Sequence, residues 1–507
     1  MVFQRIMKKL RRNKQDGSSR RRDDGCRPWP IRAASSSAIE ERADVQSQSS
    51  DPDARTFTNY AEEDNGVEDV WNIDDDVENS TATSTPSVHP LVEQTVRQGE
   101  ARRYSRHTFC LAGDFTLNLR DMEAIIDFLT DLPNAVNRII FLQTTFSVPV
   151  MQLFCSFLVR PDSRIQRLIL SSVVLEEAES ALFFAALARN RSVAELVFHD
   201  YTVDVDATVG QALALVLPRC CQLTSLSIRG CDVTETGLFY LSTAATFKHI
   251  KTLCLRGCKL NSHHVELLLN GFLASRNYSL QSLDLSNNKL CFRSLKWLAG
   301  FLQEEVSGLQ VLSLTGNTHL FDGAEQVTKN LADSLAQNTC LRAIELERCG
   351  LQERSASLLF QSLEKNTTLR AVNIRINSGI GVSGHSHMIQ SISQFSGLRM
   401  LTFDALFPEL DNSLLSALEK NTSLTKLVAH YGLDQAVQNK VKTILRRNQL
   451  YLIAQLPFLS PMNLTQRGLV AICLLRLAKE VNPRVKNDVV GTTAIFSIIR
   501  KYQPWNF

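Results

Sequence analysis

The chain has 507 residues, of which 44% are apolar and 21% charged, and its formal net charge is +3. This composition is ordinary for a soluble protein, and so small a net charge points to no class of partner. The longest uncharged apolar run near the C-terminus, residues 468–475, is far shorter than the roughly 20 residues that span a bilayer. Charged residues fill the first 22 positions, so neither a membrane-spanning nor a secreted chain is expected.

The N-terminal fifth of the chain is divided by charge. Residues 1–32 contain eleven Lys or Arg and three Asp, whereas residues 33–79 contain fourteen Asp or Glu and two Arg. Blocks of like charge with few aliphatic residues cannot bury enough surface to offset chain entropy. We therefore expect residues 1–100 to be a disordered tail, with a basic part (1–32), an acidic part (33–79) and a linker (80–100).

The basic part also suggests a targeting signal. Its two clusters have the spacing of a bipartite nuclear-import signal, and the first cluster also fits a basic amphipathic helix for an organelle or membrane surface. A solvated basic tail is the third alternative. The candidate signal residues are Lys8, Lys9, Arg11, Arg12, Arg20, Arg21 and Arg22. The acidic part could in turn dock on a basic groove of this same protein, such as the region of Arg229 and Arg256 described below.

A repeated pattern begins at about residue 106. The frame L-x-x-L-x-L recurs with starting positions 26–32 residues apart, which is the long end of the range for leucine-rich repeats. The copies start at Val136, Ile165, Val193, Leu223, Ile250, Leu280, Leu309, Leu341, Leu369, Leu398 and Leu424. A period-2 strand followed by a helical pattern in each copy predicts an α/β solenoid over residues 106–445.

Two polar positions recur in phase with this frame. Cys or Asn follows the predicted strand in six copies, at Cys231, Cys258, Asn288, Asn317, Cys349 and Asn377, where a small polar group can meet buried backbone groups. A second Asn ends the helical half of four repeats, at Asn190, Asn338, Asn366 and Asn421. We expect this second Asn to adopt the left-handed conformation that caps helices.

With these positions, the chain resembles the ribonuclease-inhibitor-type leucine-rich-repeat family. The resemblance covers residues 106–445 and implies a horseshoe of about eleven strand–helix repeats of 28–29 residues. It implies little about activity, because relatives include inhibitors, immune sensors, GTPase activators and ubiquitin-ligase substrate receptors.

The strand frame predicts which side chains face the concave side. The leucines point into the core, and the residues between and after them point the other way. The first repeats then present an apolar patch of Ile140, Ile169 and Val197. Later repeats present charged residues, namely Arg229, Arg256, Asp284, Glu345, Glu347 and Arg375. We interpret these nine residues as a candidate partner-binding surface; alternatively, the apolar patch is covered locally and the charges are only solvated.

Beyond residue 445 the frame is lost, and residues 446–507 are expected to form a helical cap. Residues 464–481 and 489–501 have helical patterns. Within the first, Leu469, Cys473 and Leu477 resemble an elongin-C-binding box, although Gly468 departs from that pattern and no cullin box follows.

No P-loop, GxSxG, HExxH or dinucleotide-binding fingerprint occurs, so no enzyme activity, cofactor or metal is expected. We therefore predict an intracellular scaffold or receptor, cytoplasmic or nuclear and monomeric, that binds a protein rather than a small-molecule substrate or a specific nucleic acid. A substrate receptor of a cullin-type ubiquitin ligase is the first alternative, and a small-GTPase activator is the second.

Overall fold

The strands form one sheet in which every neighbouring pair is parallel and the order follows the sequence. The computed structural model describes residues 88–100, 107–131, 136–200, 202–242, 247–274, 279–304, 308–323, 325–404, 407–429 and 434–454. The strands are β1 (Thr108–Leu117), β2 (Arg138–Phe146), β3 (Arg167–Ser171), β4 (Glu195–His199), β5 (Ser225–Arg229), β6 (Thr252–Cys254), β7 (Ser282–Asp284), β8 (Val311–Ser313), β9 (Ala343–Glu345), β10 (Ala371–Asn373), β11 (Met400–Phe403) and β12 (Lys426–Ala429).

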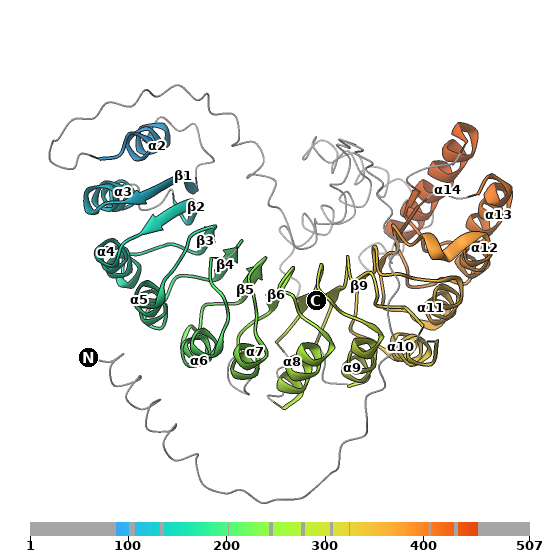
Figure 1. Ribbon diagram of the computed structural model, residues 1–507. Helices are drawn as coiled ribbons and strands as arrows, with labels where there is room; N and C mark the ends of the chain where they lie inside the picture. The colour runs from blue at the N-terminus through green and yellow to red at the C-terminus, as the bar shows by residue number, and fades with distance from the viewer. Residues whose placement is uncertain are drawn as a thin grey trace, which may run out of the picture. The chain divides into compact units, whose positions relative to one another are not determined.

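A helix follows each strand and lies on the outer side of the arc that the strands line (Figure 1). The helices are α2 (Pro90–Glu100), α3 (Leu119–Asp131), α4 (Val148–Val159), α5 (Glu177–Leu187), α6 (Ala207–Val216), α7 (Glu235–Leu241), α8 (Ser262–Ala274), α9 (Phe292–Gln303), α10 (Glu325–Gln337), α11 (Glu353–Lys365), α12 (Gly381–Ile392), α13 (Asp411–Lys420) and α14 (Gln435–Ala454). Short 3₁₀ turns span Leu217–Arg219, Ser378–Ile380 and Pro408–Leu410. The predicted leucine-rich-repeat solenoid is thus confirmed.

The core lies between the sheet and the helices. Frame leucines such as Leu226, Leu283 and Leu312 are fully buried, because every second side chain of a strand points to the same face. Rows of phenylalanines continue the packing between repeats; for example, the rings of Phe247 and Phe272 are 5.1 Å apart. A repeat buries its apolar face only against its neighbours, so the array forms one continuous core.

The structure differs from the prediction at both ends of the array. Strand β1 precedes the first expected copy, which makes twelve strands among the described residues. Its core positions Phe109 and Leu111 match the second half of the frame, but the first frame position is Arg106. Helix α2 lies within the expected linker; Val92 on it is fully buried, which explains why residues 90–100 form a helix. Residues 1–87 lie outside the described residues.

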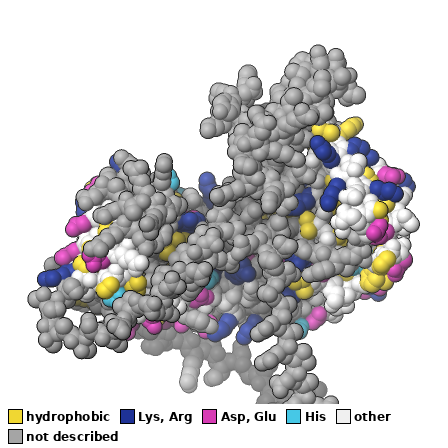
Figure 2. Space-filling view, turned by 90° about the horizontal axis from the view of Figure 1, so that it is seen from above, with side chains coloured by type: hydrophobic (Ala, Val, Ile, Leu, Met, Phe, Trp, Pro, Cys, Tyr) yellow, Lys and Arg dark blue, Asp and Glu magenta, His cyan; other side chains and the backbone are white. Residues whose placement is uncertain are grey.

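Helix α14 crosses the expected boundary between solenoid and cap at residue 445. Its buried residues Val441 and Leu445 continue the core of the preceding repeat. Figure 2 shows Lys and Arg side chains gathered at this end of the molecule, where Figure 1 places α13 and α14. Residues 455–507, which include the two helices expected in the cap, lie outside the described residues.

The Cys or Asn that follows six of the strands connects neighbouring repeats, as predicted. Asn377 donates from Nδ2 to the carbonyls of Leu346 and Ile374, both at 2.8 Å, and its Oδ1 accepts from the amides of Cys349 and Leu351 at 3.0 Å. Where the residue is a cysteine, its thiol is the donor to the preceding repeat: that of Cys258 donates to the Ile228 carbonyl at 3.0 Å. These side chains pair backbone groups that the turn would otherwise leave buried without partners.

The second row of asparagines has a different conformation from the one expected. Asn366 and Asn421 follow their helices with φ of −79° and −80° and ψ of 124° and 133°, which is extended and not left-handed. Extended backbone directs each side chain inward, where it bonds both its own turn and the preceding repeat. Asn421, for instance, donates to the carbonyls of Ile392 and Phe395 and accepts from the amide of Leu424. This row is a second ladder rather than a series of helix caps.

The left-handed position occurs elsewhere, within β2 and one to three residues after the strand in eight other repeats. It is occupied by Gln143, Ser172, Asp200, Gly230, Gly257, Asn287, Gly316, Arg348 and Ile376, with φ between 51° and 77°. In most of these repeats the amide at this position donates to a carbonyl of the next repeat, as from Gly230 to Arg256 at 2.9 Å. Glycine adopts this conformation without steric cost, whereas a β-branched residue such as Ile376 is strained there.

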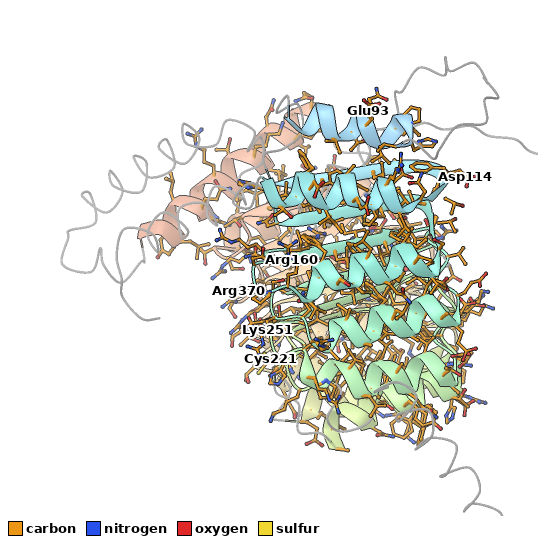
Figure 3. The ribbon with its side chains drawn as sticks, turned by 90° about the vertical axis from the view of Figure 1, so that its left-hand side faces the viewer. Glu93, Asp114, Arg160, Cys221, Lys251 and Arg370 are labelled. Carbon is orange, nitrogen blue, oxygen red and sulfur yellow. The ribbon has the colours of Figure 1, made fainter. Side chains whose placement is uncertain are left out.

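The two flanks of the solenoid carry different connections. Turns from helix to strand lie on one flank, and loops from strand to helix lie on the other. Figure 3 shows Arg160, Lys251 and Arg370 on the first flank, although they belong to three separated repeats, and Asp114 on the opposite one.

Candidate functional site

The concave face is built from two rows of side chains on the strands. Strand register aligns Ile140, Ile169, Val197, Ser227, Cys254, Asp284, Ser313, Glu345, Asn373 and Thr402 in one row. The second row, one side chain further along each strand on the same face, includes His199 and Arg229, which are also aligned. These are the rows that the strand frame predicted.

The apolar end of the first row is buried rather than exposed. Ile140, Ile169 and Val197 are only 5%, 7% and 6% exposed and pack together, with Cys110 and Leu142 against them. Parallel strands lie about 4.8 Å apart, so large side chains in one row cover each other. The three residues have the predicted positions, but little of their surface is available for binding a partner.

A basic cluster occupies the middle of the face, formed by His199, Arg229 and Arg256 on three consecutive repeats. Both arginines are half-buried, and Nε of Arg229 donates to Oγ of Ser227 at 2.9 Å. Burial lowers the pKa of His199; neighbouring Asp200 opposes this shift, and the charges of Arg229 and Arg256 add to it. The two guanidinium groups therefore create a positive potential at His199.

His199 also contacts a serine, but the arrangement is not that of a catalytic triad. Its Nδ1 lies 3.2 Å from Oγ of Ser171 and 2.9 Å from Oδ2 of Asp200. In a triad, the serine and the acid bind opposite nitrogens of the ring. Because both contacts here involve the same nitrogen, this histidine does not relay a proton between them.

Acidic residues occupy the next repeats, and neighbouring side chains hold them in place. Oε2 of Glu345 accepts from Oγ of Ser313 at 2.6 Å. Oε2 of Glu347 accepts from Nδ2 of Asn373 at 2.9 Å. These hydrogen bonds fix the directions of both carboxylates. Because Glu345 and Glu347 are partly exposed, they remain accessible to a partner.

Asp284 connects the basic and acidic parts. Its Oδ1 accepts from the amide of Ser286 at 2.9 Å, and its Oδ2 accepts from the Cys254 thiol at 3.2 Å. Burial, followed by the charge of Asp284, raises the pKa of Cys254 to about 12, so this cysteine remains a protonated thiol. Further along, Nε of Arg375 lies 3.9 Å from Oδ1 of Asp404, and the Ile376 amide donates to the same carboxylate.

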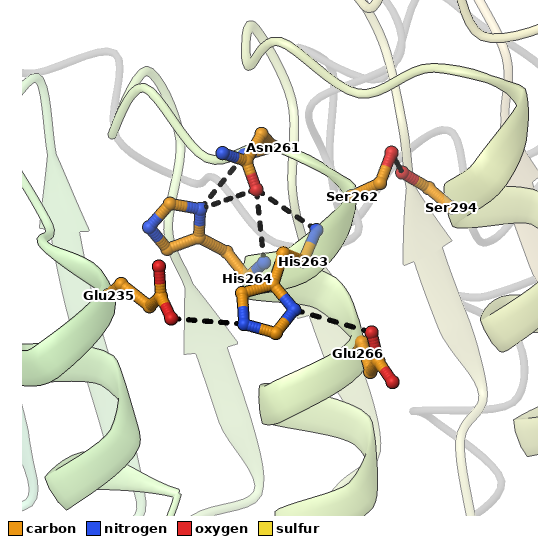
Figure 4. Close-up of polar contacts among 7 residues, drawn as sticks. All are labelled: Glu235, Asn261, Ser262, His263, His264, Glu266 and Ser294. Atoms are coloured by element: carbon orange, nitrogen blue, oxygen red, sulfur yellow. Dashed lines mark hydrogen bonds and ion pairs between the residues drawn. The ribbon is translucent and has the colours of Figure 1, made fainter. Parts of the chain in front are cut away.

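A polar cluster that the sequence analysis did not predict lies on the flank of the strand-to-helix loops (Figure 4). At the start of α8, His263 bridges two carboxylates, with Nε2 3.0 Å from Oε1 of Glu235 and Nδ1 3.3 Å from Oε2 of Glu266. The hydrogen bond with Glu266 and the contacts with Glu235 raise the pKa of His263, whereas burial lowers that of His264. Glu235 lies one repeat earlier, so 28-residue spacing was the only signal in the sequence.

The cysteines nearest to this cluster do not join it. Cys254 is on the concave row, and Cys258 bonds the Ile228 carbonyl inside the core. Among the residues that the structure describes, no three His, Cys, Asp or Glu side chains form a group able to hold a metal ion. Within the same residues, no helix is long and apolar enough to cross a membrane.

Comparisons with known proteins agree with the repeat architecture. The chain is 29% identical over 226 residues to the NACHT, LRR and PYD domains-containing protein 14 of Mus musculus, which is 44% of this chain and 22% of the relative. It is 28% identical over 186 residues to the Centrosomal protein of 78 kDa of Homo sapiens, which is 36% of this chain and 25% of the relative. The alignments thus span about a quarter of each relative, and no family model matches the chain.

Solved structures of lower similarity were also found. The Leiomodin-1 Actin-Binding Site 2 has a TM-score of 0.25 and 18% identity, covering 31% of this chain and 88% of that one. The C-terminal domain of Caenorhabditis elegans tropomodulin has a TM-score of 0.28 and 15% identity, covering 31% and 95%. At these scores, assignment of the leucine-rich-repeat fold depends on the repeat geometry of this chain and on the leucine-rich-repeat relatives.

Proposed function

We propose that the chain is a scaffold or receptor that binds a protein partner on the concave face of its solenoid. One observation carries the proposal. Two clusters of opposite charge, Arg229 with Arg256 and Glu345 with Glu347, lie half-exposed on a sheet of fixed register, with Asp284 between them and Arg375 beyond. Charged groups that are already oriented are bound with little ordering cost.

The spacing of the two clusters defines the kind of partner. Arg229 is on β5 and Glu345 on β9, four strands apart, which corresponds to roughly 19 Å at about 4.8 Å per strand. That distance fits within one ordinary protein interface. The complementary surface would carry an acidic patch and a basic patch about 19 Å apart, and such complementarity favours orientation and specificity.

Charge reversal on the two faces of the solenoid tests this proposal. The concave variant is Arg229→Glu with Arg256→Glu, and the matched control is Lys296→Glu with Lys329→Glu on the outer helices α9 and α10. Both change the net charge equally. Removing one partner of a buried charge pair costs about 2–5 kcal/mol of binding free energy. Even the lower value, about 2 kcal/mol, corresponds to about a 30-fold loss of affinity, so we expect at least that loss for partners of the concave face.

The readout is quantitative affinity capture from cells, together with the melting temperature of each variant. We expect the concave variant to lose a defined set of proteins that the control retains, at an unchanged melting temperature. Equal loss in both variants, or full retention in the concave variant, would refute the assignment of this face.

Several finer statements belong to the same proposal. Strand–helix alternation and the Cys or Asn position after each strand support the ribonuclease-inhibitor-type subfamily. Recognition by this surface needs no catalysis and no cofactor, and we propose a monomer in the cytoplasm.

The elongin-C-box-like segment 469–477 and the targeting residues between 8 and 22 lie outside the described residues, so the ubiquitin-ligase alternative and nuclear import remain predictions. The small-GTPase activator alternative also remains a prediction.

A further inference from the structure

The four neighbouring helices α4 to α7 have almost no charged side chains. Helices α4 and α6 contain no charged residue, and the charged residues of α5 and α7 are confined to their first turns. Their outer faces expose apolar residues, among uncharged polar ones such as Gln152 and Thr208. Leu215 and Phe239 are 41% and 56% exposed. We call the outer band the exposed or partly exposed surface of Leu153, Leu182, Ala185, Ala212, Leu215 and Phe239.

Outer helices later in the array differ in this respect. Helix α10, for example, exposes Glu325, Lys329 and Asp333. Helix α12 also lacks Lys, Arg, Asp and Glu, but only Val382 of its four exposed side chains is apolar. A surface helix of a soluble protein normally places charged and polar residues on its outer face. Four neighbouring helices that expose apolar residues without charge have the pattern of a surface that another molecule covers.

One border of the outer band is acidic. The segments that lead from strand to helix into α5, α6 and α7 contain Asp and Glu but no Lys or Arg; they are residues 172–179, 200–206 and 230–235. The short connection into α4 is uncharged. Asp200, Asp232 and Glu235 already face basic side chains of the solenoid. Glu176 and Glu177 are exposed, and among the described residues no basic side chain pairs with them.

The other border is basic. The turns that follow α4 to α7 are residues 160–166, 188–194, 217–224 and 242–251, and each contains Arg or Lys. Their one acid, Asp162, pairs with Arg160 at 2.8 Å. Arg189, Arg191 and Arg219 are exposed and pair with no carboxylate in the part of the chain that the structure describes. Helix dipoles favour acids at helix starts and bases at helix ends, which accounts for the two borders but not for the uncharged band between them.

The dimensions of the outer band suit a single helix laid across it. Packed helices lie about 8–10 Å apart, so the three spacings from α4 to α7 cover roughly 24–30 Å. At about 1.5 Å per residue, a helix of about 16–20 residues crosses all four. Figure 3 looks onto this face, with α4, α5 and α6 side by side and Arg160 at their C-terminal ends.

We infer that the outer band is the docking surface for an amphipathic helix of a partner protein, laid across α4 to α7. The apolar face of that helix is bordered by Lys or Arg on one side, which faces the acidic loops, and by Asp or Glu on the other, which faces the arginines of the turns. Such opposite borders fix the orientation of the helix. This surface is separate from the concave face, because the helices lie on the outer side of the arc (Figure 1).

The shape and charge of the face favour a helix over two other occupants. The outer face is convex, and two convex faces separate from their contact twice as fast as one convex face and a straight helix. A second copy would therefore cover less of the band. An anionic membrane would be attracted by the basic border but repelled by the acidic one.

Designed helical peptides test this inference on the full chain. The probe is a fluorescent peptide of about 18 residues with Leu on its apolar face, Lys along one border and Glu along the other. Two reference peptides keep the Leu face but carry Lys on both borders or Glu on both borders. In anisotropy titrations we expect the Lys/Glu peptide to bind roughly tenfold more tightly than either reference, because each reference places like charges against one border.

A charge placed in the band locates the binding site. Ala185→Glu with Leu215→Glu changes two exposed side chains of the band, and Gln390→Glu with Ser416→Glu adds the same charge to exposed positions of α12 and α13. The first variant should bind the Lys/Glu peptide roughly tenfold more weakly, since a carboxylate would be buried against its Leu face, and the second should bind it like wild type. The concave variant Arg229→Glu with Arg256→Glu should also bind it like wild type, so this inference and the concave-face proposal fail independently.

Reversing one border tests the charge pattern. Arg189→Glu with Arg219→Glu makes both borders acidic, so this variant should bind the peptide with two Lys borders more tightly than the Lys/Glu peptide. A variant that had only lost stability would not invert the preference in this way.

The inference is overturned if the three peptides bind wild type equally, if the band variant and its control lose the same affinity, or if the preference does not invert. Two other results would assign the band to a different occupant and also overturn it. One is a dimer in sedimentation that Ala185→Glu with Leu215→Glu dissociates. The other is binding to phosphatidylserine vesicles that the same variant abolishes.

Discussion

The ladder of asparagines that ends the helices gives the sharpest test of how the repeats hold together. Asn366 is 3% exposed, and its Nδ2 donates to the carbonyls of Leu335 at 2.6 Å and Asn338 at 3.0 Å. Its Oδ1 accepts from the amides of Thr368 at 2.8 Å and Leu369 at 2.6 Å. Oδ1 also accepts a longer bond from Oγ1 of Thr368 at 3.3 Å. One side chain thus makes five hydrogen bonds and joins two repeats.

Replacing Asn366 with Ala removes all five bonds. The Asn338 carbonyl keeps a bond from Oγ1 of Thr368, and the Thr368 amide is partly accessible to water. The Leu335 carbonyl and the Leu369 amide lose their side-chain partner inside the core. At about 1–3 kcal/mol for each buried group, the free energy of unfolding should fall by about 2–6 kcal/mol.

The assay is urea unfolding followed by circular dichroism, with hydrogen exchange of residues 366–370 as a local readout. Asn330→Ala is the matched control, because Asn330 is exposed on α10 and accepts one bond at 3.3 Å. We expect this control to change stability by less than about 0.5 kcal/mol. A loss below about 1 kcal/mol for Asn366→Ala, or one equal to the control, would refute the ladder argument.

Asn366→Asp adds a pH signature. A carboxyl group keeps the acceptor bonds but places an oxygen against the Leu335 and Asn338 carbonyls, so burial and these contacts should raise its folded-state pKa. An acid with a raised folded-state pKa loses stability as the pH rises above its unfolded value of about 4. This variant should therefore be more stable at pH 4 than at pH 7 relative to wild type, whereas Asn366→Ala should not show that difference.

Three further outcomes follow from the geometry. Ile376→Gly should stabilise the chain by about 0.5–1 kcal/mol in thermal unfolding, because glycine relieves the left-handed strain at φ 53°. Gly237→Ala should destabilise it by about 1–3 kcal/mol, since a Cβ there would lie 2.0 Å from a backbone carbonyl; Gly300→Ala, with open space around it, should instead stabilise helix α9 by about 0.5–1 kcal/mol. Arg256→Met should raise the pKa of His199 in an NMR titration, because the charge of Arg256 helps to lower it. Since the pKa of His199 is lowered in the folded wild type, the free energy of unfolding falls as the pH drops below about 6.5, and this fall should be smaller in the variant.

The sequence by itself determined the repeat. A leucine frame at 26–32-residue spacing has one structural solution, because alternating side chains must be buried on one side of every strand. The Cys or Asn position after the strand was equally readable, since six copies have one of these small polar groups there and its side chain bonds buried carbonyls.

Tertiary structure decided what depends on neighbouring repeats. Strand β1 lacks the first frame residue and forms because β2 offers it a parallel edge. Ile140 and its two neighbours in the row are buried because aligned strands stack large side chains on each other. Asn366 is extended because its side chain has partners in the preceding repeat. Arg342, Arg370 and Arg399 behave in the same way: they are 28 and 29 residues apart in sequence, and only winding of the solenoid lets each bond the turn of the next repeat.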